Sequence, residues 1–261
     1  MPTLKEIIKT YGAIPPLTSF KRPMFIGPHP DDIEYGCGGI ISKYSELGIP
    51  VIFVIVTDGA AGGIGEPESI KEMRYEESKN AASFLGVENV EFCDLEDGGI
   101  YTVEDALKRI IPYVLEYKPD IIFGPDSRLL TECHPDHLKV GEAVRQLTQI
   151  VPYKQSLIRH GIDVSNYNDF PNNITLALYF SDNPNYIEEI SEKNLREKIN
   201  ALLIHCSQMK DSSSELLLNY FKLKAVALGE KNHTALGEDY QILVPLCRHV
   251  YSEGVHYNDW E

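Results

Sequence analysis

Residues 51–56, Val-Ile-Phe-Val-Ile-Val, form an unbroken apolar and largely β-branched run. A run without polar alternation is typical of a parallel strand that helices cover on both faces of its sheet. Shorter apolar runs recur along the chain, separated by segments with helical spacing and helix-stop signals. This alternation predicts an α/β fold with a mostly parallel sheet and helices on both of its faces.

The expected elements follow this alternation through most of the chain. The expected strands are residues 24–26, 51–56, 90–93, 121–124, 174–180 and 186–190. The expected helices are residues 4–11, 36–48, 68–85, 103–117, 137–149, 192–208 and 215–228, of which the last stops at Gly229. Residues 152–173 lose the pattern, and we interpret the stretch 150–175 as a lid or an assembly loop. No repeat or linker divides the chain, so residues 1–261 are expected to form a single domain.

The charge balance narrows the possible partners. The chain has 24 Lys and Arg against 39 Asp and Glu, which gives a formal net charge of −15. Nucleic acids and anionic membrane surfaces attract basic proteins, so we expect neither as a partner. A neutral or cationic small substrate is compatible with this charge.

The cysteines and the apolar runs indicate the compartment. The five cysteines are odd in number and none has CxxC spacing, which favours buried thiols in a reducing environment. The start of the chain lacks the pattern of a signal peptide, and no run approaches the ~20 apolar residues of a membrane-spanning helix. We therefore expect a cytoplasmic protein.

Two polar clusters follow expected strands. His29, Asp31 and Asp32 come directly after the strand at 24–26, and His134, Asp136 and His137 come after the strand at 121–124. In an α/β sheet the carboxyl ends of the strands are where ligands bind. Either cluster alone could be a pair of structural histidines beside solvated turn residues, but two clusters at two strand ends favour a shared metal site.

A catalytic zinc site needs three protein ligands, usually histidines and a carboxylate, and one open position. His29, Asp32 and His137 provide this set, so we expect one Zn²⁺ per chain, with another divalent metal as an alternative. Zinc lowers the pKa of its bound water to about 7. Asp31, beside the ligands, is then placed to take the proton of that water as general base.

The remaining residues of the second cluster have candidate roles as well. A protonated His134 could stabilise an oxyanion and later donate a proton to a leaving amine. Asp136 could orient His134 or hold its charge.

Two glycine-rich stretches allow more than one interpretation. Gly36-x-Gly38-Gly39 could bind a phosphate at a helix start, but carboxylates precede it, so close helix packing is favoured. The loop 60–65 follows the strand at 51–56 and could either close over a substrate or merely connect two elements.

At this point the motifs resemble a known family. The matching residues are Pro28-His29-Pro30-Asp31-Asp32-x-Glu34 with Gly36-Cys37-Gly38-Gly39, Thr57-Asp58-Gly59, Arg74-x-x-Glu77 and His134-Pro135-Asp136-His137. Together they resemble the LmbE/PIG-L family of zinc-dependent N-acetylglucosamine deacetylases. Later segments, at 178–180, 184–187, 198–208 and 237–240, are similar to the branch of diacetylchitobiose deacetylases.

The resemblance implies a Rossmann-like fold and a role for each motif residue. Its zinc ligands correspond to His29, Asp32 and His137, its general base to Asp31, and its oxyanion-stabilising histidine to His134 with Asp136 as partner. It further implies a substrate-contacting arginine at Arg74, a carboxylate near the sugar at Asp97 and an active-site histidine at His249. Ile33 and Pro28 depart from the simplest family motif but leave every ligand in place.

The residues themselves allow simpler interpretations at some of these positions. Arg74 could form an ion pair with Glu76 or Glu77 on a helix surface, and Asp97 could be a turn residue. The remaining histidines have no partner that the sequence identifies, and we expect them to be structural or surface residues; they are His160, His205, His233 and His256.

The sequence thus predicts a zinc-dependent hydrolase that removes the N-acetyl group from a GlcNAc-containing sugar such as N,N'-diacetylchitobiose. One alternative is a deacetylase of another N-acyl amino-sugar conjugate, such as GlcNAc-malate in thiol synthesis. Another is a non-catalytic sugar- or nucleotide-binding Rossmann domain. The segment 150–175 and the aromatic tail, with Tyr251, Tyr257 and Trp260, lead us to expect a homo-oligomer, a trimer or a hexamer.

Overall fold

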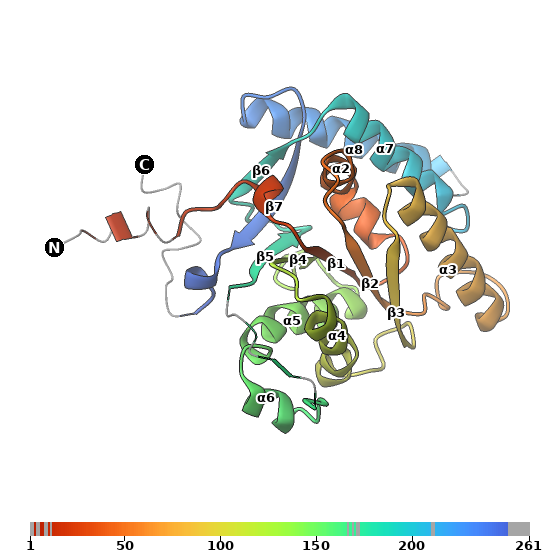
Figure 1. The fold of residues 1–261 in the computed structure, drawn as a ribbon. Coiled ribbons are helices and arrows are strands. Elements are labelled where there is room, and N and C mark those ends of the chain that lie inside the picture. The colour runs from red at the N-terminus through yellow and green to blue at the C-terminus, as the bar shows by residue number, and fades with distance from the viewer. Residues whose placement is uncertain are drawn as a thin grey trace.

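Seven strands form one sheet in the order β3-β2-β1-β4-β5-β7-β6 (Figure 1). The structure is a computed structural model, and it describes residues 3, 6–7, 10, 12–165, 167–168, 170, 173–209 and 212–249. The strands are β1 (Pro23–Gly27), β2 (Ile52–Thr57), β3 (Asn89–Leu95), β4 (Ile121–Pro125), β5 (Thr175–Tyr179), β6 (Tyr186–Glu189) and β7 (Gly237–Leu243). The helices are α2 (Asp32–Glu46), α3 (Pro67–Phe84), α4 (Val103–Tyr117), α5 (Pro135–Ile150), α6 (Lys154–Arg159), α7 (Glu192–Ile204) and α8 (Ser212–Lys231), with 3₁₀ turns η1 (Leu17–Ser19) and η2 (Pro245–Arg248).

The predicted mostly parallel α/β sheet is confirmed. Strands β1 to β5 run parallel to one another, while β7 is antiparallel to both β5 and β6. The order β3-β2-β1-β4-β5 is that of a doubly wound, Rossmann-like sheet. In such a sheet the strand order reverses between β1 and β4, and the crevice at their carboxyl ends is the usual ligand site.

Two hydrophobic layers cover the sheet. Because side chains alternate along a strand, Met24 and Ile26 of β1 pack with α4 and α5 on one face, whereas Phe25 packs with α2, α3 and α7 on the other. All three residues are fully buried. The β2 run is buried at every position, which explains why it has no polar alternation. Figure 1 shows the two helical layers on either side of the sheet.

Some predicted boundaries differ from the structure. Helix α2 begins at Asp32 rather than residue 36, so the second aspartate of the motif already belongs to the helix. Helix α7 ends at Ile204, four residues before the predicted end. The predicted helix at 4–11 falls largely on residues outside the described ones.

The predicted stop at Gly229 is wrong, because α8 continues to Lys231. A Cβ on Gly229 would lie 2.5 Å from the carbonyl carbon of Ala235, so this glycine permits a close approach of the chain that leads into β7. His233, two residues after the helix, takes the left-handed conformation with φ +57°. Strand β7 itself was missed by the sequence analysis.

The described residues of segment 150–175 pack beside α4 and α5. The segment contains the short helix α6, and Leu157, Ile162 and Phe170 join the core beside α4 and α5. The role of this segment, as a lid or in assembly, stays a prediction.

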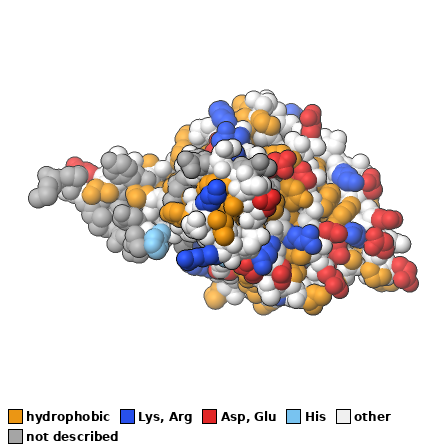
Figure 2. Space-filling model, turned by 60° about the horizontal axis from the view of Figure 1, so that its bottom comes forward, with side chains coloured by type: hydrophobic (Ala, Val, Ile, Leu, Met, Phe, Trp, Pro, Cys, Tyr) orange, Lys and Arg blue, Asp and Glu red, His pale blue; other side chains and the backbone are white. Residues whose placement is uncertain are grey.

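The described surface displays the acidic excess of the sequence. Figure 2 shows Asp and Glu side chains gathered at the side of the molecule where α3 lies in Figure 1, with Lys and Arg scattered among them. Glu68, Glu72 and Glu76 of α3 are exposed.

Candidate metal and active site

The carboxyl ends of the neighbouring strands β1 and β4 bring the two polar clusters together. The ring centroid of His29 lies 4.7 Å from that of His134 and 5.3 Å from that of His137. These residues are about a hundred positions apart in the sequence but share the crevice at the reversal of strand order.

One carboxylate connects the two clusters directly. Oδ2 of Asp32 lies 3.0 Å from Nδ1 of His29, and its Oδ1 lies 3.3 Å from Nε2 of His137. The same Oδ2 accepts a hydrogen bond from the backbone N–H of His29, at 2.8 Å, which fixes the turn before α2. Two overlapping groups have ligand atoms within 4.8 Å of one another: His29, His134 and His137, and His29, Asp97 and Asp136.

These residues fit a divalent metal ion. Imidazole nitrogens with carboxylate oxygens are the donor set of catalytic zinc sites. Nε2 of His29 is buried and makes no hydrogen bond of acceptable geometry with the described residues, although Oδ1 of Asp97 lies 3.2 Å away. Such a nitrogen among several carboxylates is suited to bind a cation.

The electrostatics also favour positive charge at this position. Burial lowers the pKa of His29, but interactions with Asp136, Asp32 and Asp97 outweigh it and raise the pKa to about 12. Burial raises the pKa of Asp32, yet His137 and His29 bring it well below its usual range. Burial likewise opposes a low pKa at Asp136, which His29 nevertheless helps lower to about 2. The carboxylates that hold a proton here would equally hold a metal cation.

Asp31 differs from Asp32 in its surroundings. Burial raises the pKa of Asp31 to about 6, while the guanidinium of Arg74 acts in the opposite direction. Its φ of +138° is unusual for a residue other than glycine, and conformations of this kind occur at functional sites. Thr57 of β2 donates its backbone N–H and its hydroxyl to the carbonyl of Pro28, which holds the preceding turn.

Arg74 is a buried residue of α3 and not part of a surface ion pair, so the pairing with Glu76 or Glu77 is wrong. Its Nη1 donates to the carbonyl of Gly59 and its Nη2 to the carbonyl of Pro30, each at 3.0 Å. Nη2 also lies 3.3 Å from Oδ2 of Asp31. Arg74 therefore joins the metal turn to the loop after β2 and supports the candidate base.

The loop 60–65 forms a wall of the site. A Cβ on Gly59 would lie 2.9 Å from Nη1 of Arg74, so the glycine lets the loop cover the guanidinium. The backbone N–H of Ala61 donates to Oδ2 of Asp97 at 3.1 Å. The carbonyl of Gly62 accepts from Nε2 of Gln208 at 2.8 Å. The loop is thus held by residues from three other elements and is more than a connector.

Asp136 is fully buried and has several partners. It accepts hydrogen bonds from the backbone N–H groups of Gly98 and Gly99 and lies 3.5 Å from both Nε2 of His29 and Nδ1 of His134. His134 caps α5 by accepting the N–H of Asp136, and its side chain is 47% exposed. The half-exposed imidazole therefore stands at the mouth of the site, next to a carboxylate that holds two loops.

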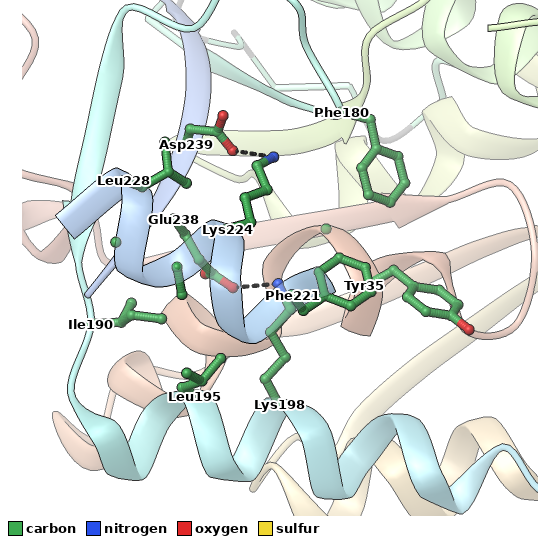
Figure 3. Close-up of a pocket in the computed structure, with 13 residues that line it drawn as sticks. Tyr35, Phe180, Ile190, Leu195, Lys198, Phe221, Lys224, Leu228, Glu238 and Asp239 are labelled. Atoms are coloured by element: carbon green, nitrogen blue, oxygen red, sulfur yellow. Dashed lines mark hydrogen bonds and ion pairs between the residues drawn. The ribbon is translucent and has the colours of Figure 1, made fainter. Parts of the chain in front are cut away.

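The glycines at the start of α2 serve packing, as predicted, and not phosphate binding. Figure 3 shows Lys198 of α7 paired with Glu238 of β7, at 2.6 Å. Glu238 also accepts the backbone N–H groups of Gly39 and Ile40. A Cβ on Gly39 would lie 2.7 Å from the carboxyl carbon of Glu238, and one on Gly38 would lie 2.7 Å from Cγ of Lys198. The ion pair thus fills the place that the glycines leave open.

A cavity lies over the two polar clusters. Its volume of about 370 Å³ is within the range of small-molecule sites. Its polar lining includes His29, Asp31, Asp32, Arg74, Asp97 and His134, together with Tyr35 and Gln208. The last two were not identified by the sequence analysis.

Two further partners were missed. Glu132 Oε2 lies 2.9 Å from Nδ1 of His137, on the ring side away from Asp32. His205 is fully buried, with Nε2 3.3 Å from Oε1 of Glu34. His205 and Glu34 are far apart in the sequence, so no sequence pattern links them. Glu132 stands beside the second histidine motif and could have been considered.

His249 is not brought to this site within one chain. It follows η2, beyond the end of β7, and the neighbouring Arg248 donates to the carbonyl of Thr148 at 3.1 Å. Thr148 lies eleven residues, or about 16 Å of helix, after His137 on α5. His249 therefore lies at the opposite edge of the sheet, and Tyr251, Tyr257 and Trp260 lie outside the described residues.

The chain and its fold are similar to those of known proteins. A diacetylchitobiose deacetylase of Thermococcus kodakarensis is 29% identical over 243 residues, which cover 90% of this chain and 88% of that protein. The structure of N,N'-diacetylchitobiose deacetylase from Pyrococcus horikoshii, in complex with its inhibitor MPG, superposes with a TM-score of 0.86 at 27% identity and covers 96% of both chains. A probable N-acetyl-alpha-D-glucosaminyl L-malate deacetylase 2 of Bacillus anthracis is 27% identical and covers 77% of this chain and 87% of that protein.

The described helices include none with the length and apolarity to cross a membrane. Residues 24–148 match the profile of the PIG-L family, described as GlcNAc-PI de-N-acetylase. That range contains both polar clusters, Arg74 and Asp97. By this match and by its similarity to diacetylchitobiose deacetylases over most of its length, the chain is similar to the LmbE/PIG-L deacetylases.

Proposed function

We propose that this protein hydrolyses the N-acetyl group of a GlcNAc-containing sugar such as N,N'-diacetylchitobiose, releasing acetate and a free amine. The observation that carries the proposal is the convergence of His29, Asp32 and His137 beside the buried carboxylate of Asp31, at the base of a sugar-sized cavity. The similarity to diacetylchitobiose deacetylases over most of the chain supports this substrate class.

The ion that fits the site is Zn²⁺, one per chain, and His29, Asp32 and His137 would hold it. When bound, zinc supplies a Lewis acid that polarises the acetamide carbonyl and increases the acidity of water. Glu132, next to Nδ1 of His137, would keep that imidazole oriented with its Nε2 toward Asp32.

The residues of the chain perform the proton transfers. Asp31, held by Arg74, takes a proton from the attacking water. His134 at the cavity mouth stabilises the charge that develops on the carbonyl oxygen and delivers a proton to the leaving amine. Asp136 holds the imidazole of His134, since the two groups lie 3.5 Å apart. Arg74 and Asp97 line the cavity and would contact the sugar.

The place of His249 supports an assembly. His249 lies at the far edge of its own sheet, so an active-site role would require it to reach the cavity of a neighbouring subunit. This agrees with the expected homo-oligomer, a trimer or hexamer, in which segment 150–175 would contribute contacts. We further propose that the protein acts in the cytoplasm.

Metal content and acetate release test the proposal. The purified protein should contain about one zinc per chain and release acetate from the β-1,4 dimer of N-acetylglucosamine, and a chelator should abolish the release. GlcNAc-malate belongs in the same substrate panel, because a GlcNAc-malate deacetylase is among the relatives. If the protein released acetate from GlcNAc-malate and not from the disaccharide, GlcNAc-malate would be the substrate in place of the disaccharide. A protein without metal would refute the hydrolase and favour a binding domain.

A further inference from the structure

The turn after α7 places one neutral amide in a cavity lined otherwise by charged or apolar groups and Tyr35. Gln208 belongs to this turn and lines the cavity with Asp31 and Arg74. The hydroxyl of Tyr35 already contacts Sδ of Met209, at 3.5 Å. Figure 3 shows the ring of Tyr35 beside that of Phe221. Gln208 is therefore the neutral polar side chain best placed to contact a sugar.

The orientation of the Gln208 carboxamide is fixed by its neighbours. Its Nε2 donates to the carbonyl of Gly62 at 2.8 Å and to Oγ of Ser207 at 3.1 Å. The backbone N–H and the hydroxyl of Ser207 in turn donate to the carboxylate of Glu77 of α3, at 2.7 and 2.6 Å. Because the nitrogen has two acceptors, the amide cannot rotate by 180° without losing both hydrogen bonds.

The carboxamide oxygen has no such partner. Among the described residues nothing donates to Oε1 of Gln208, and this atom is not enclosed by protein. Because Nε2 of this fixed amide donates to two protein acceptors, its Oε1 is the acceptor that is left for a ligand in the cavity. The chemistry that satisfies an acceptor of this kind is a neutral hydroxyl or N–H donor, and a sugar ring offers several hydroxyls.

We infer that Gln208 is a specificity-determining residue whose Oε1 accepts a hydrogen bond from a ring hydroxyl of the sugar that carries the acetamide. The inference rests on the proposed function. Hydrogen-bonded sites discriminate against analogues that lack the donor, because the acceptor is then left unpaired.

The test is a double-mutant cycle in which one change is made in the enzyme and the other in the substrate. Acetate release is measured for wild type and Gln208→Ala with the β-1,4 dimer of N-acetylglucosamine and with its analogues that lack one hydroxyl on the acetamide-bearing sugar. A neutral hydrogen bond predicts a loss of roughly 3- to 10-fold in kcat/KM for Gln208→Ala. One deoxy analogue should cost wild type a similar factor and cost Gln208→Ala nothing further.

Ser207→Ala is the matched control. It removes the hydroxyl that joins Gln208 to Glu77 but keeps the acceptor in the cavity, so its preference among the analogues should equal that of wild type. Dissociation constants of the same sugars, measured by calorimetry on chains that also carry Asp31→Asn, provide a readout without turnover and should show the same pattern.

The outcomes separate the two claims. An equal loss by Gln208→Ala on every analogue would mean that the residue only supports the loop, and the inference would be overturned while the proposed function stood. If wild type released no acetate from any of these sugars, the proposed function would fail and take the inference with it.

Discussion

Arg74 lies beneath the loop after β2 with its Nη2 3.3 Å from Oδ2 of Asp31. A guanidinium in this position offsets part of the cost of burying a carboxylate, while burial still leaves the pKa of Asp31 at about 6. The pair therefore keeps a candidate base ionised at neutral pH and close to its proton-accepting range.

Asp31→Asn should keep the metal and lose most turnover. The amide cannot accept the proton of water, and general-base catalysis contributes about 10²- to 10⁴-fold. Zinc content measured by mass spectrometry should equal that of wild type while kcat falls by at least about a hundredfold. A rate near that of wild type would show that another group is the base.

Arg74→Met should move the acid limb of the pH–rate profile upward. Arg74 lowers the pKa of Asp31, so its removal raises that pKa, and a larger fraction of Asp31 is protonated at any given pH. In a profile of kcat/KM from about pH 5 to about pH 9, the fall on the acid side should begin at a higher pH than in wild type. An unshifted acid limb would mean that Arg74 does not act through Asp31.

His137→Ala should lose the metal. His137 is one of the three proposed ligands, with Nε2 beside Asp32, and a catalytic zinc site needs three protein ligands. His160→Ala is the control, because His160 pairs with Glu104 and neither residue lines the cavity. Full zinc occupancy in His137→Ala would contradict the proposed ligand set.

Lys198→Met should destabilise the fold. Lys198 and Glu238 are both buried, and removal of one partner from a buried ion pair typically costs about 3–5 kcal/mol. Lys193→Met, on the same helix, removes an exposed ion pair with Glu46 and should cost much less. Urea unfolding of both variants measures the difference, and equal effects would refute a special role for the buried pair.

His205 should make stability depend on pH. Burial lowers its pKa, but Glu34 and neighbouring acids outweigh this and raise the pKa above the ordinary 6.5. A raised pKa in the folded state contributes stability that is fully present below pH 6.5 and is lost as the pH rises through the folded-state value. The free energy of unfolding lost in His205→Gln should therefore shrink as the pH rises, and a pH-independent difference would contradict the charged pair.

The central sheet could be predicted because its strands are buried on both faces and leave a continuous apolar record, as in β2. Strand β7 was missed because Glu238 and Asp239 interrupt its apolar pattern. The strand tolerates these carboxylates because Lys198 and Lys224 pair with them. Polar residues that are satisfied only by distant partners give no local signal.

The same reason separates the predicted and missed parts of the site. The first and second clusters follow two adjacent strands, so topology alone brings His29 and His137 together. Gln208 reaches the cavity from a turn about seventy residues after His137. Arg74 was named through the family resemblance, but its burial depends on a loop whose glycines looked unconstrained. Neither contact follows from local pattern.

The hydrogen bonds from Gly39 and Ile40 to Glu238 have a consequence for biosynthesis. All the candidate metal ligands have been synthesised once residue 137 has emerged from the ribosome. Strand β7, whose Glu238 holds α2 through these hydrogen bonds, is synthesised about a hundred residues later. Because domains fold as units during synthesis, the nascent chain should hold an incomplete, poorly fixed cluster until β7 is available. Messages truncated before residue 237 would thus yield chains that carry every ligand and no finished site.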